Sequence, residues 1–529
     1  MQFSTFNFSK KQNNRLKTVL KVGILLLVLT TFISYFGKIK IEEKIAEIAG
    51  LECEKINVNI LLRKASLGNL TYQWNGASMD SSSLACKTIQ LKGISWWQLL
   101  VHNQLKVRVL SVGNVQGNIN GAMDESEETE AKTKKEPQLK SIYIDDIFLE
   151  KVNINFDQKE KFKIKLGDLR LHFNQLKYDF EDIQKALTYQ GFEMSFENGK
   201  WIPYGGNHYL ESGKMQSNME EKDFEIKDLI YKKFYDRERT NTKDKKERLH
   251  FKAKSIVGSD LDYQKLIAGE GVFLKNLTLD NSNLDVFVKK KRKPCESCYK
   301  AFLHEKLIKA KLPVHIEKVE LKNNGISIDI ENVEKEKMAH VDFEKIYASV
   351  YHISNIEEQI KTNPKIIADV QTLFMGEEKL ETQIKCNLND PQYGYEFKAT
   401  LDKMNLLVMN DVLEFGTKAR VKSGDLKSLT MQVKGNQEVS TGTMNFQYEN
   451  LEVELLREKK IKVKKFLSKV INKLAIQKSN KKSEGNFKEG KIYFLRNKNK
   501  GLFAQWWGAI QSGFQSTILP KILLPKELK

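Results

Sequence analysis

The stretch Gly269 to Phe287, GEGVFLKNLTLDNSNLDVF, decides the fold because its pattern recurs along the chain. Val272 and Leu274 lie two apart, and after a shift of one residue Leu277 and Leu279 also lie two apart. The polar run Asp280 to Asn283 follows, and then Leu284 and Val286 lie two apart again. Alternation with period two is typical of a strand with one apolar face, and a one-residue shift is typical of a bulge. We therefore interpret the stretch as a strand with a bulge, a polar turn and a second strand.

The same apolar positions recur at three other places. The first copy contains Val272, Leu274, Leu277, Leu279, Leu284 and Val286, and the copy 42 residues later contains Val314, Ile316, Val319, Leu321, Ile326 and Ile328. A copy 167 residues earlier contains Leu105, Val107, Leu110, Val112, Gly117 and Ile119, of which only Gly117 lacks an apolar side chain. A looser copy runs from Ile142 to Phe156. Repetition of one supersecondary unit predicts an elongated, curved antiparallel sheet built from neighbouring copies.

The residues before two of these copies also correspond. Ile94, Trp96, Leu99 and Leu100 match Leu261, Tyr263, Leu266 and Ile267, with spacing that predicts a short helix before the strands. Further alternating stretches predict that the sheet continues toward the C-terminus: Val341 to Ile353, Ile366 to Phe374, Leu380 to Leu388, Tyr393 to Leu401, Ala419 to Val433 and Thr441 to Leu455. The polar segments Asp124 to Pro137 and Asp236 to Arg248 are predicted to be loops.

The N-terminus has the pattern of a membrane anchor. A mostly apolar, uncharged run extends from Val22 to Phe36, and a basic head without acidic residues precedes it. Residues 19–37 are close to the roughly 20 needed to cross a bilayer as a helix, and the basic head favours the cytoplasmic side. A cleaved signal peptide is the alternative, but Tyr35 and Phe36 suit a cleavage site poorly because cleavage requires small residues. We expect a single-pass anchor with most of the chain on the other side of the membrane.

Composition restricts the partners. The formal net charge is +19, and 29% of residues are charged. Basic residues can bind nucleic acid, but a chain exported behind an anchor more readily meets anionic lipid headgroups. We therefore expect membrane lipids as partners and no nucleic acid.

The five cysteines are too scattered for a disulfide scaffold; they are Cys53, Cys86, Cys295, Cys298 and Cys386. Cys295 and Cys298 have the spacing of a local disulfide, of an unpaired couple, or of half a metal site that lacks its second half. The sequence also contains no HExxH, no nucleophile elbow and no phosphate-binding loop, and its eight histidines have no ligand spacing. We expect no catalytic residues, no metal and no cofactor.

Two C-terminal stretches read as helices. The first is basic and amphipathic, and lies between Arg457 and Lys482. It suits either an anionic membrane surface or a cap on the end of the sheet. The second, Leu502 to Leu519, places five large apolar residues on one side, which suits a membrane or partner contact as well as packing on the last strands: Phe503, Trp506, Trp507, Ile510 and Phe514.

Several segments together resemble a known family. They are IQLKGISWWQLL leading into LKVRVLSVGNVQGNI, the block SGDLKSLTMQVKGNQEVSTGTMNFQYENLEVELL, and the ending GKIYFLRNKNKGLFAQWWGAIQSGF. Within the block, the matching positions are Gly424, Leu426, Leu429, Gly442, Tyr448, Leu451 and Leu455. The chain resembles the AsmA-like, TamB-related envelope proteins with a repeating β-groove, most of all their Bacteroidetes-type branch. The resemblance implies an inner-membrane anchor and a periplasmic β-groove whose concave face is apolar and accepts lipid acyl chains. It also implies an outer-membrane or envelope protein as a further candidate partner.

The resulting hypothesis divides the chain into a basic head (1–18), an anchor (19–37), a first groove region (38–123), a linker (124–137), a groove continuation (138–456) and an amphipathic C-terminal region (457–529). The lipid-facing candidates are the apolar positions of three copies: Leu105, Val107, Leu110, Val112, Val272, Leu274, Leu277, Leu279, Val314, Ile316, Val319 and Leu321. The expected function is assistance in phospholipid transport or outer-membrane assembly, without catalysis. A closed sheet that serves as an envelope adaptor is the alternative.

Overall fold

The computed structural model describes residue 31 and the ranges 34–39, 41–43, 45–75, 81–120, 139–158, 161–180, 187–203, 208–233, 248–290, 299–332, 337–376, 378–416, 419–455 and 476–528. Most of the predicted anchor, the linker 124–137, most of the loop 236–248, Cys295, Cys298 and most of the basic stretch 457–482 lie outside these residues. The chain is divided into two compact units. Unit 1 comprises residues 1–206 and 211–220, and unit 2 comprises residues 207–210 and 221–529.

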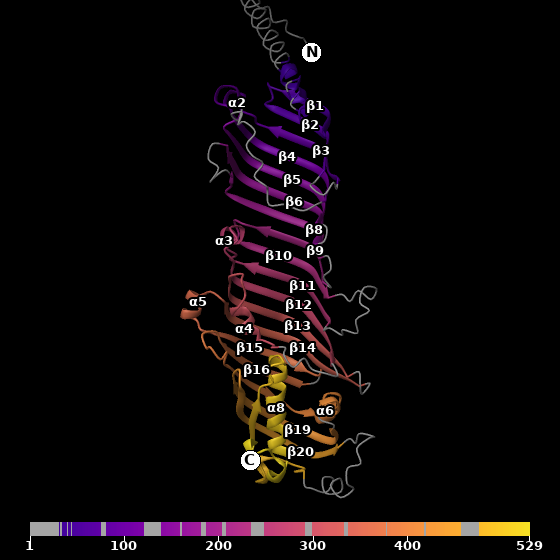
Figure 1. The fold of residues 1–529 in the computed structure, drawn as a ribbon, viewed down its shortest axis with the longest axis vertical. Helices are drawn as coiled ribbons and strands as arrows, with labels where there is room; N and C mark the ends of the chain where they lie inside the picture. The colour runs from indigo at the N-terminus through magenta and orange to yellow at the C-terminus, as the bar shows by residue number, and fades with distance from the viewer. Residues whose placement is uncertain are drawn as a thin grey trace, which may run out of the picture. The chain divides into compact units, whose positions relative to one another are not determined.

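Unit 1 is mainly β. Its elements are β1 (Leu51–Asn59), β2 (Lys64–Asn75), β3 (Ser81–Lys92), α2 (Trp96–His102), β4 (Gln104–Asn120), β5 (Ser141–Gln158), β6 (Phe162–Asp179), β7 (Leu187–Thr188) and β8 (Gly191–Pro203). The long strands pair as β1–β2–β3–β4–β5–β6–β8, in chain order (Figure 1). Within the described residues the outer strands of this order do not pair with each other, so the sheet is open. Strand β9 (His208–Asn218) contributes residues to both units.

Unit 2 repeats this architecture. Its elements are β10 (Asp223–Lys233), β11 (Arg248–Ser259), α3 (Tyr263–Ile267), β12 (Val272–Lys290), α4 (Leu303–Ile308), β13 (Val314–Asn332), β14 (Lys337–Ser354), α5 (Glu357–Thr362), β15 (Lys365–Phe374), β16 (Glu378–Asn387), β17 (Tyr395–Leu401), β18 (Met404–Asn405), α6 (Asn410–Gly416), β19 (Ala419–Gly435), β20 (Val439–Leu455), β21 (Gly490–Leu495) and α8 (Leu502–Ile518). Strands β10 to β17 pair in chain order and continue through β19, β20 and β21. All the alternating stretches predicted between Val341 and Leu455 lie in or overlap strands of this sheet.

The predicted turn inside each repeat is wrong. Val272–Lys290 is one continuous strand, and so is Val314–Asn332. The polar residues Asn281 and Asn323 adopt left-handed conformations, with φ of 50° and 56°. Such a residue rotates the pleat by one position and bends the strand without reversing it. Asparagine tolerates this conformation, and the amide of Asn323 donates to Oδ1 of Asn281 across the two strands at 2.6 Å.

These backbone breaks align across strands. In unit 1 they occur at Asn69, Asn114, Lys151, Asp168 and Asn198, which all have positive φ and lie in β2, β4, β5, β6 and β8. Unit 2 has a corresponding series at Asp228, Asn281, Asn323 and Lys345. Because bulges increase bend and twist, an aligned series curves each sheet.

The repeats pair side by side, but not in the predicted sense. Val272 lies opposite Val314, Leu274 opposite Ile316 and Leu279 opposite Leu321, so the 42-residue offset is the register of the pair β12–β13. This pair is parallel, as is β4–β5, where Leu105 lies opposite Ile142. The other registered pairs are antiparallel, so the prediction of a purely antiparallel sheet is corrected at these two places. A parallel pair requires the chain to cross back between the strands, as it does between residues 290 and 314.

Candidate functional site: an open apolar sheet face

The predicted short helices lead into the repeats. α2 begins at Trp96 and α3 begins at Tyr263, which are the two positions matched in the sequence. The residues two positions earlier, Ile94 and Leu261, are only 2% and 5% exposed. A buried residue therefore holds each short helix at the start of the strand that follows it, β4 or β12. The sequence predicted both helices.

One face of unit 1 is apolar across its long strands. The register places Leu91, Leu110 and Ile147 in one row across β3, β4 and β5. A second row contains Ile89, Val112 and Leu149. These rows belong to two clusters whose buried members are Ala65, Ile94, Val107, Ile144 and Ile147 in one, and Cys86, Val115, Val152 and Leu169 in the other. The predicted lipid-facing residues of β4 therefore lie together on one continuous apolar surface.

This apolar face is only partly buried. Leu105, Leu110 and Val112 are intermediate in exposure, whereas Val107 is fully buried. Within the described part of unit 1, α2 contacts β4 near one end of the sheet, and no helix lies across the middle of the face. A sheet face with large aliphatic side chains in partial contact with water is a surface to which apolar ligands can bind.

The opposite face of unit 1 is polar. His172 Nε2 lies 3.1 Å from Asp146 Oδ1 on the neighbouring strand, and its ring stacks on Phe148. Ion pairs join Lys163 to Asp157 and Lys177 to Asp179. One face of the sheet is therefore apolar and the other is charged. The charged face suits contact with water, and the apolar face suits contact with an apolar ligand.

In unit 2, the predicted lipid-facing residues of β12 and β13 pair in register. Leu277 lies opposite Val319, and Val272 lies opposite Val314. Leu274 and Val319 are buried, and the other residues of the set are intermediate in exposure: Val272, Leu277, Leu279, Val314, Ile316 and Leu321. The neighbouring strands β11 and β14 continue these rows with Ile256, Val350 and Ala348.

Helix α8 covers the apolar face at the C-terminal end of unit 2, where it lies across β19 and β20 (Figure 1). Trp506 contacts Phe397, and Phe514 contacts Phe446 edge to face with ring centres 4.8 Å apart. Ile510 packs on the same core. Of the five residues predicted to contact a membrane or partner, these three pack on the sheet, Trp507 is intermediate in exposure, and Phe503 is 64% exposed.

Helix α8 also contacts the last strand through polar groups. Ser512 accepts a hydrogen bond from the backbone N–H of Tyr493 at 3.1 Å, and Ser516 accepts one from that of Lys491 at 2.7 Å. Edge strands expose unpaired backbone groups that invite further pairing. The two hydroxyls occupy such groups on β21, so α8 terminates the sheet as well as covering it.

A polar cluster holds the segment around α4 against Gln437 and Arg496 in the C-terminal part of unit 2. The Glu305 side chain is 1% exposed and accepts hydrogen bonds from Tyr299, Lys309 and Gln437. Burial by itself raises the pKa of this carboxyl, but the hydrogen bonds, Lys309 first, bring it below its usual value. Arg496 stacks on Phe302 and donates to the carbonyl of Lys300. Sequence reasoning missed this cluster because its members are up to 196 residues apart.

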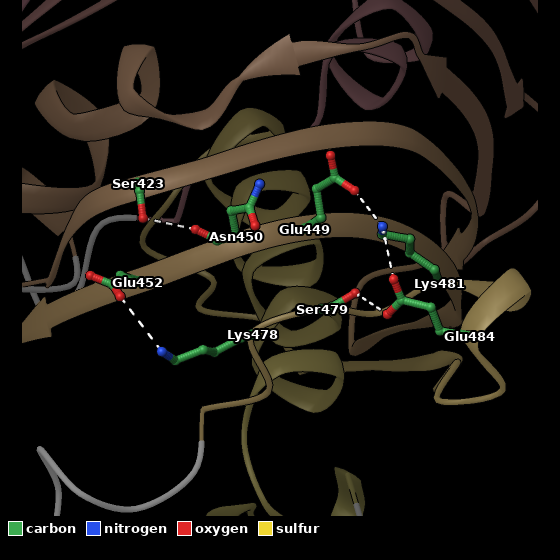
Figure 2. A pocket seen from close by; sticks show the side chains of 8 residues that line it. All are labelled: Ser423, Glu449, Asn450, Glu452, Lys478, Ser479, Lys481 and Glu484. Atoms are coloured by element: carbon green, nitrogen blue, oxygen red, sulfur yellow. Dashed lines mark hydrogen bonds and ion pairs between the residues drawn. The ribbon is translucent and has the colours of Figure 1, made fainter.

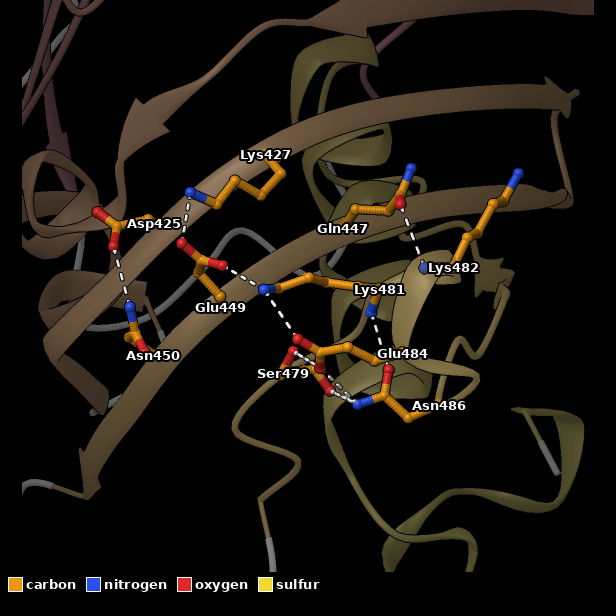
Figure 3. A network of polar contacts seen from close by, with 10 residues as sticks. All are labelled: Asp425, Lys427, Gln447, Glu449, Asn450, Ser479, Lys481, Lys482, Glu484 and Asn486. Carbon is orange, nitrogen blue, oxygen red and sulfur yellow. Dashed lines mark hydrogen bonds and ion pairs between the residues drawn. The ribbon is translucent and has the colours of Figure 1, made fainter.

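A polar pocket of ≈ 250 Å³ lies beside β19 and β20 (Figure 2). Its lining is mostly charged or amide side chains: Ser423, Glu449, Asn450, Glu452, Lys478, Ser479, Lys481 and Glu484. Glu449 pairs with both Lys427 and Lys481, and Lys481 also pairs with Glu484 (Figure 3). These hydrogen bonds lower the pKa of Glu449. The arrangement attaches residues 478–486 to the sheet, and its charges neutralise one another.

The cysteines and histidines of the described ranges form no metal-binding group. Cys53, Cys86 and Cys386 are free, and burial raises the pKa of Cys386 to about 12. A thiol with so high a pKa is unreactive at neutral pH. Among the residues that the structure describes, no group of three or more acidic, histidine or cysteine side chains has the geometry to hold a metal ion.

Among the described residues, no helix is long and apolar enough to cross a membrane. Comparison with known proteins adds no family: no family model matches the chain, and no curated protein matches it.

Proposed function

We propose that the open apolar faces bind the acyl chains of membrane lipids. The supporting observation is the apolar face of unit 1, which extends in register over β1 to β8 with large aliphatic side chains partly in contact with water. Acyl chains are flexible and require apolar contact more than specific hydrogen bonds. A face built from alternating aliphatic residues meets that requirement.

The lipid carrier is proposed to be anchored by residues 19–37 in the inner membrane, with the sheet in the periplasm, as the resemblance to AsmA-like proteins implies. It assists phospholipid transport or outer-membrane assembly without covalent chemistry. The separation of an apolar face from a face with ion pairs such as Lys163–Asp157 supports a sheet that holds lipid on one side and faces water on the other.

The test measures lipids that copurify with the full chain, by mass spectrometry. The variant carries Leu277→Asp and Leu279→Asp in unit 2 together with Leu110→Asp and Val112→Asp in unit 1. These changes place two carboxylates on the apolar face of β12 and two on that of β4. Because burying a carboxylate against an acyl chain costs well over the roughly 1.4 kcal/mol that corresponds to a factor of ten, we expect about tenfold less lipid or lower.

Thr278→Asp with Ser111→Asp is the matched control, since each residue lies between two substituted positions and therefore on the other face of its strand. It should keep the lipid. Hydrogen exchange in β2–β3 and in α8 reports that units 1 and 2 remain folded in each variant. A parent chain without lipid, or equal lipid in the parent and the quadruple variant, contradicts the proposal.

A further inference from the structure

Unit 1 carries an exposed apolar patch at one edge of its sheet, which we call the edge patch. Its residues are Leu61 (65% exposed), Leu62 (59%), Trp97 (69%), Leu100 (75%) and Val101 (51%). The first two lie in the turn between β1 and β2, and the other three lie in α2. Five large apolar side chains that are each more than half exposed on two short segments are unusual on a water-facing surface and indicate a binding surface.

Hydrogen bonds hold the two parts of the edge patch together. The Arg63 guanidinium donates to the carbonyl of Ile94 at 2.9 Å and to that of Gly93 at 3.2 Å. The backbone N–H of Ile94 donates in return to the carbonyl of Arg63 at 3.1 Å. The turn after β1 is therefore fixed against the residues that lead directly into α2.

The edge patch adjoins the end of the open apolar face. Ile94 belongs to the buried core of that face, and Trp96 packs against it. Trp97, the next residue, is exposed. Helix α2 thus presents one tryptophan to the apolar face and the other to the surroundings, so that an apolar surface continues from the sheet to its edge.

The same turn contacts the end of the predicted anchor. The backbone N–H of Ile60 donates to the Ser34 hydroxyl at 3.1 Å. Ser34 lies near the end of the apolar run Val22 to Phe36, in a helical segment where Tyr35 and Phe36 are 61% and 51% exposed. If that run spans a bilayer, its last residues lie at the headgroup level, and the edge patch lies there with them.

The chemistry of the edge patch suits a bilayer surface. Tryptophan and aliphatic residues are typical of the interface between headgroups and acyl chains. Arg63 and Lys64 follow the two leucines directly and are exposed, which places positive charge where anionic headgroups lie.

We propose that the edge patch inserts into the interfacial layer of the bilayer that holds the anchor, so that acyl chains pass along α2 onto the apolar face of unit 1. This inference rests on the proposed function. Its occupant is the lipid bilayer, and a second copy of the chain or a partner protein is an outcome that would overturn it.

The experiment uses the full chain in nanodiscs of phosphatidylethanolamine and phosphatidylglycerol. A photoreactive phenylalanine analogue replaces Trp97, Leu100 or Ile119, one position at a time. Ile119 alternates with Val115 of the apolar face along β4 and is half-buried. Leu495, which is 63% exposed in unit 2, is the control for exposure alone. After illumination, mass spectrometry identifies whether each position forms adducts with lipid or with protein.

Lipid adducts at positions 97 and 100, at least several-fold above position 495, support the proposal. Adducts no more frequent than at position 495, adducts with protein, or failure of the chain to associate with nanodiscs overturn it. Position 119 reports on the apolar face separately. If lipid adducts form at position 119 but not at 97 and 100, the proposed function holds and the insertion of the edge patch is overturned. If they form at 97 and 100 but not at 119, the edge patch contacts the membrane and the apolar face does not bind lipid.

Discussion

The apolar face of unit 1 and the C-terminal end of the face in unit 2 are built in the same way but differ in their cover. In both regions, apolar residues alternate along strands and align across them. In the C-terminal region, Val433, Met444 and Tyr448 are completely buried, because α8 packs over the sheet. In unit 1, Leu110, Val112 and Leu149 remain partly exposed. The same strand pattern thus produces a closed core or an open surface.

The cover depends on the small residues of α8. A Cβ added at Gly508 would lie 2.3 Å from the Phe494 ring, and one added at Gly513 would lie 2.7 Å from Met444 Cε. Glycine at these two positions therefore lets the helix approach the sheet closely. The comparison shows that closure is a property of the covering helix and of its distance from the sheet, whereas the strands supply only the apolar face.

The largest expected effect compares one substitution in both regions. Leu429→Ala, in the covered region, removes a side chain that is 4% exposed and should cost about 2–5 kcal/mol of local stability, because it leaves a cavity. Leu149→Ala, on the open face, should cost about 1–2 kcal/mol, since that side chain is already partly in water. Native-state hydrogen exchange in β19–β20 and in β5–β6 measures each value. Equal losses would mean that the open face is covered as tightly as the other.

A smaller effect tests how α8 is held. Ser512→Ala removes the acceptor for the backbone N–H of Tyr493 and should cost about 1–3 kcal/mol. Gln515→Ala, at an exposed position of the same helix, is the control and should change little. Exchange of the β21 amides should accelerate in the first variant only. Unchanged exchange would show that the apolar contacts alone hold the helix.

The smallest effect concerns pH. Burial lowers the pKa of His304, whose Nε2 lies 2.9 Å from the carbonyl oxygen of Tyr393. The unfolded chain then binds a proton more readily than the folded one. The stability that neutral His304 contributes to the fold is therefore complete above the ordinary histidine pKa of about 6.5 and is lost as the pH falls below it. The protection of residues 299–309 against exchange, corrected for the intrinsic pH dependence of amide exchange, should fall in the parent as the pH is lowered from 7.5 to 5.5. His304→Gln should reduce that dependence, and an equal dependence in both would assign it to other groups.

Much of the fold could be predicted because strand periodicity is local. The apolar positions of β4, β12 and β13 and the short helices α2 and α3 were predicted from spacing. The parallel direction of the pair β12–β13 was not predicted. A polar run such as Asp280 to Asn283 is compatible both with a turn, which reverses the chain, and with a left-handed bulge, which does not. The 42-residue offset identified the partner strand, but only the register shows that the two run parallel. The predicted lipid-facing residues lie on apolar faces, and their contact with lipid stays a prediction.

By itself, the sequence determined which residues form strands, which positions share the apolar face, and where a membrane anchor is expected, since alternation and apolar run length act over neighbouring residues. Only the tertiary structure decided which part of that face is covered and which is open. It also placed the turn after β1 beside α2 and joined Glu305 to Gln437. These contacts join residues far apart in the chain, and their energy depends on burial and distance, which no local pattern contains.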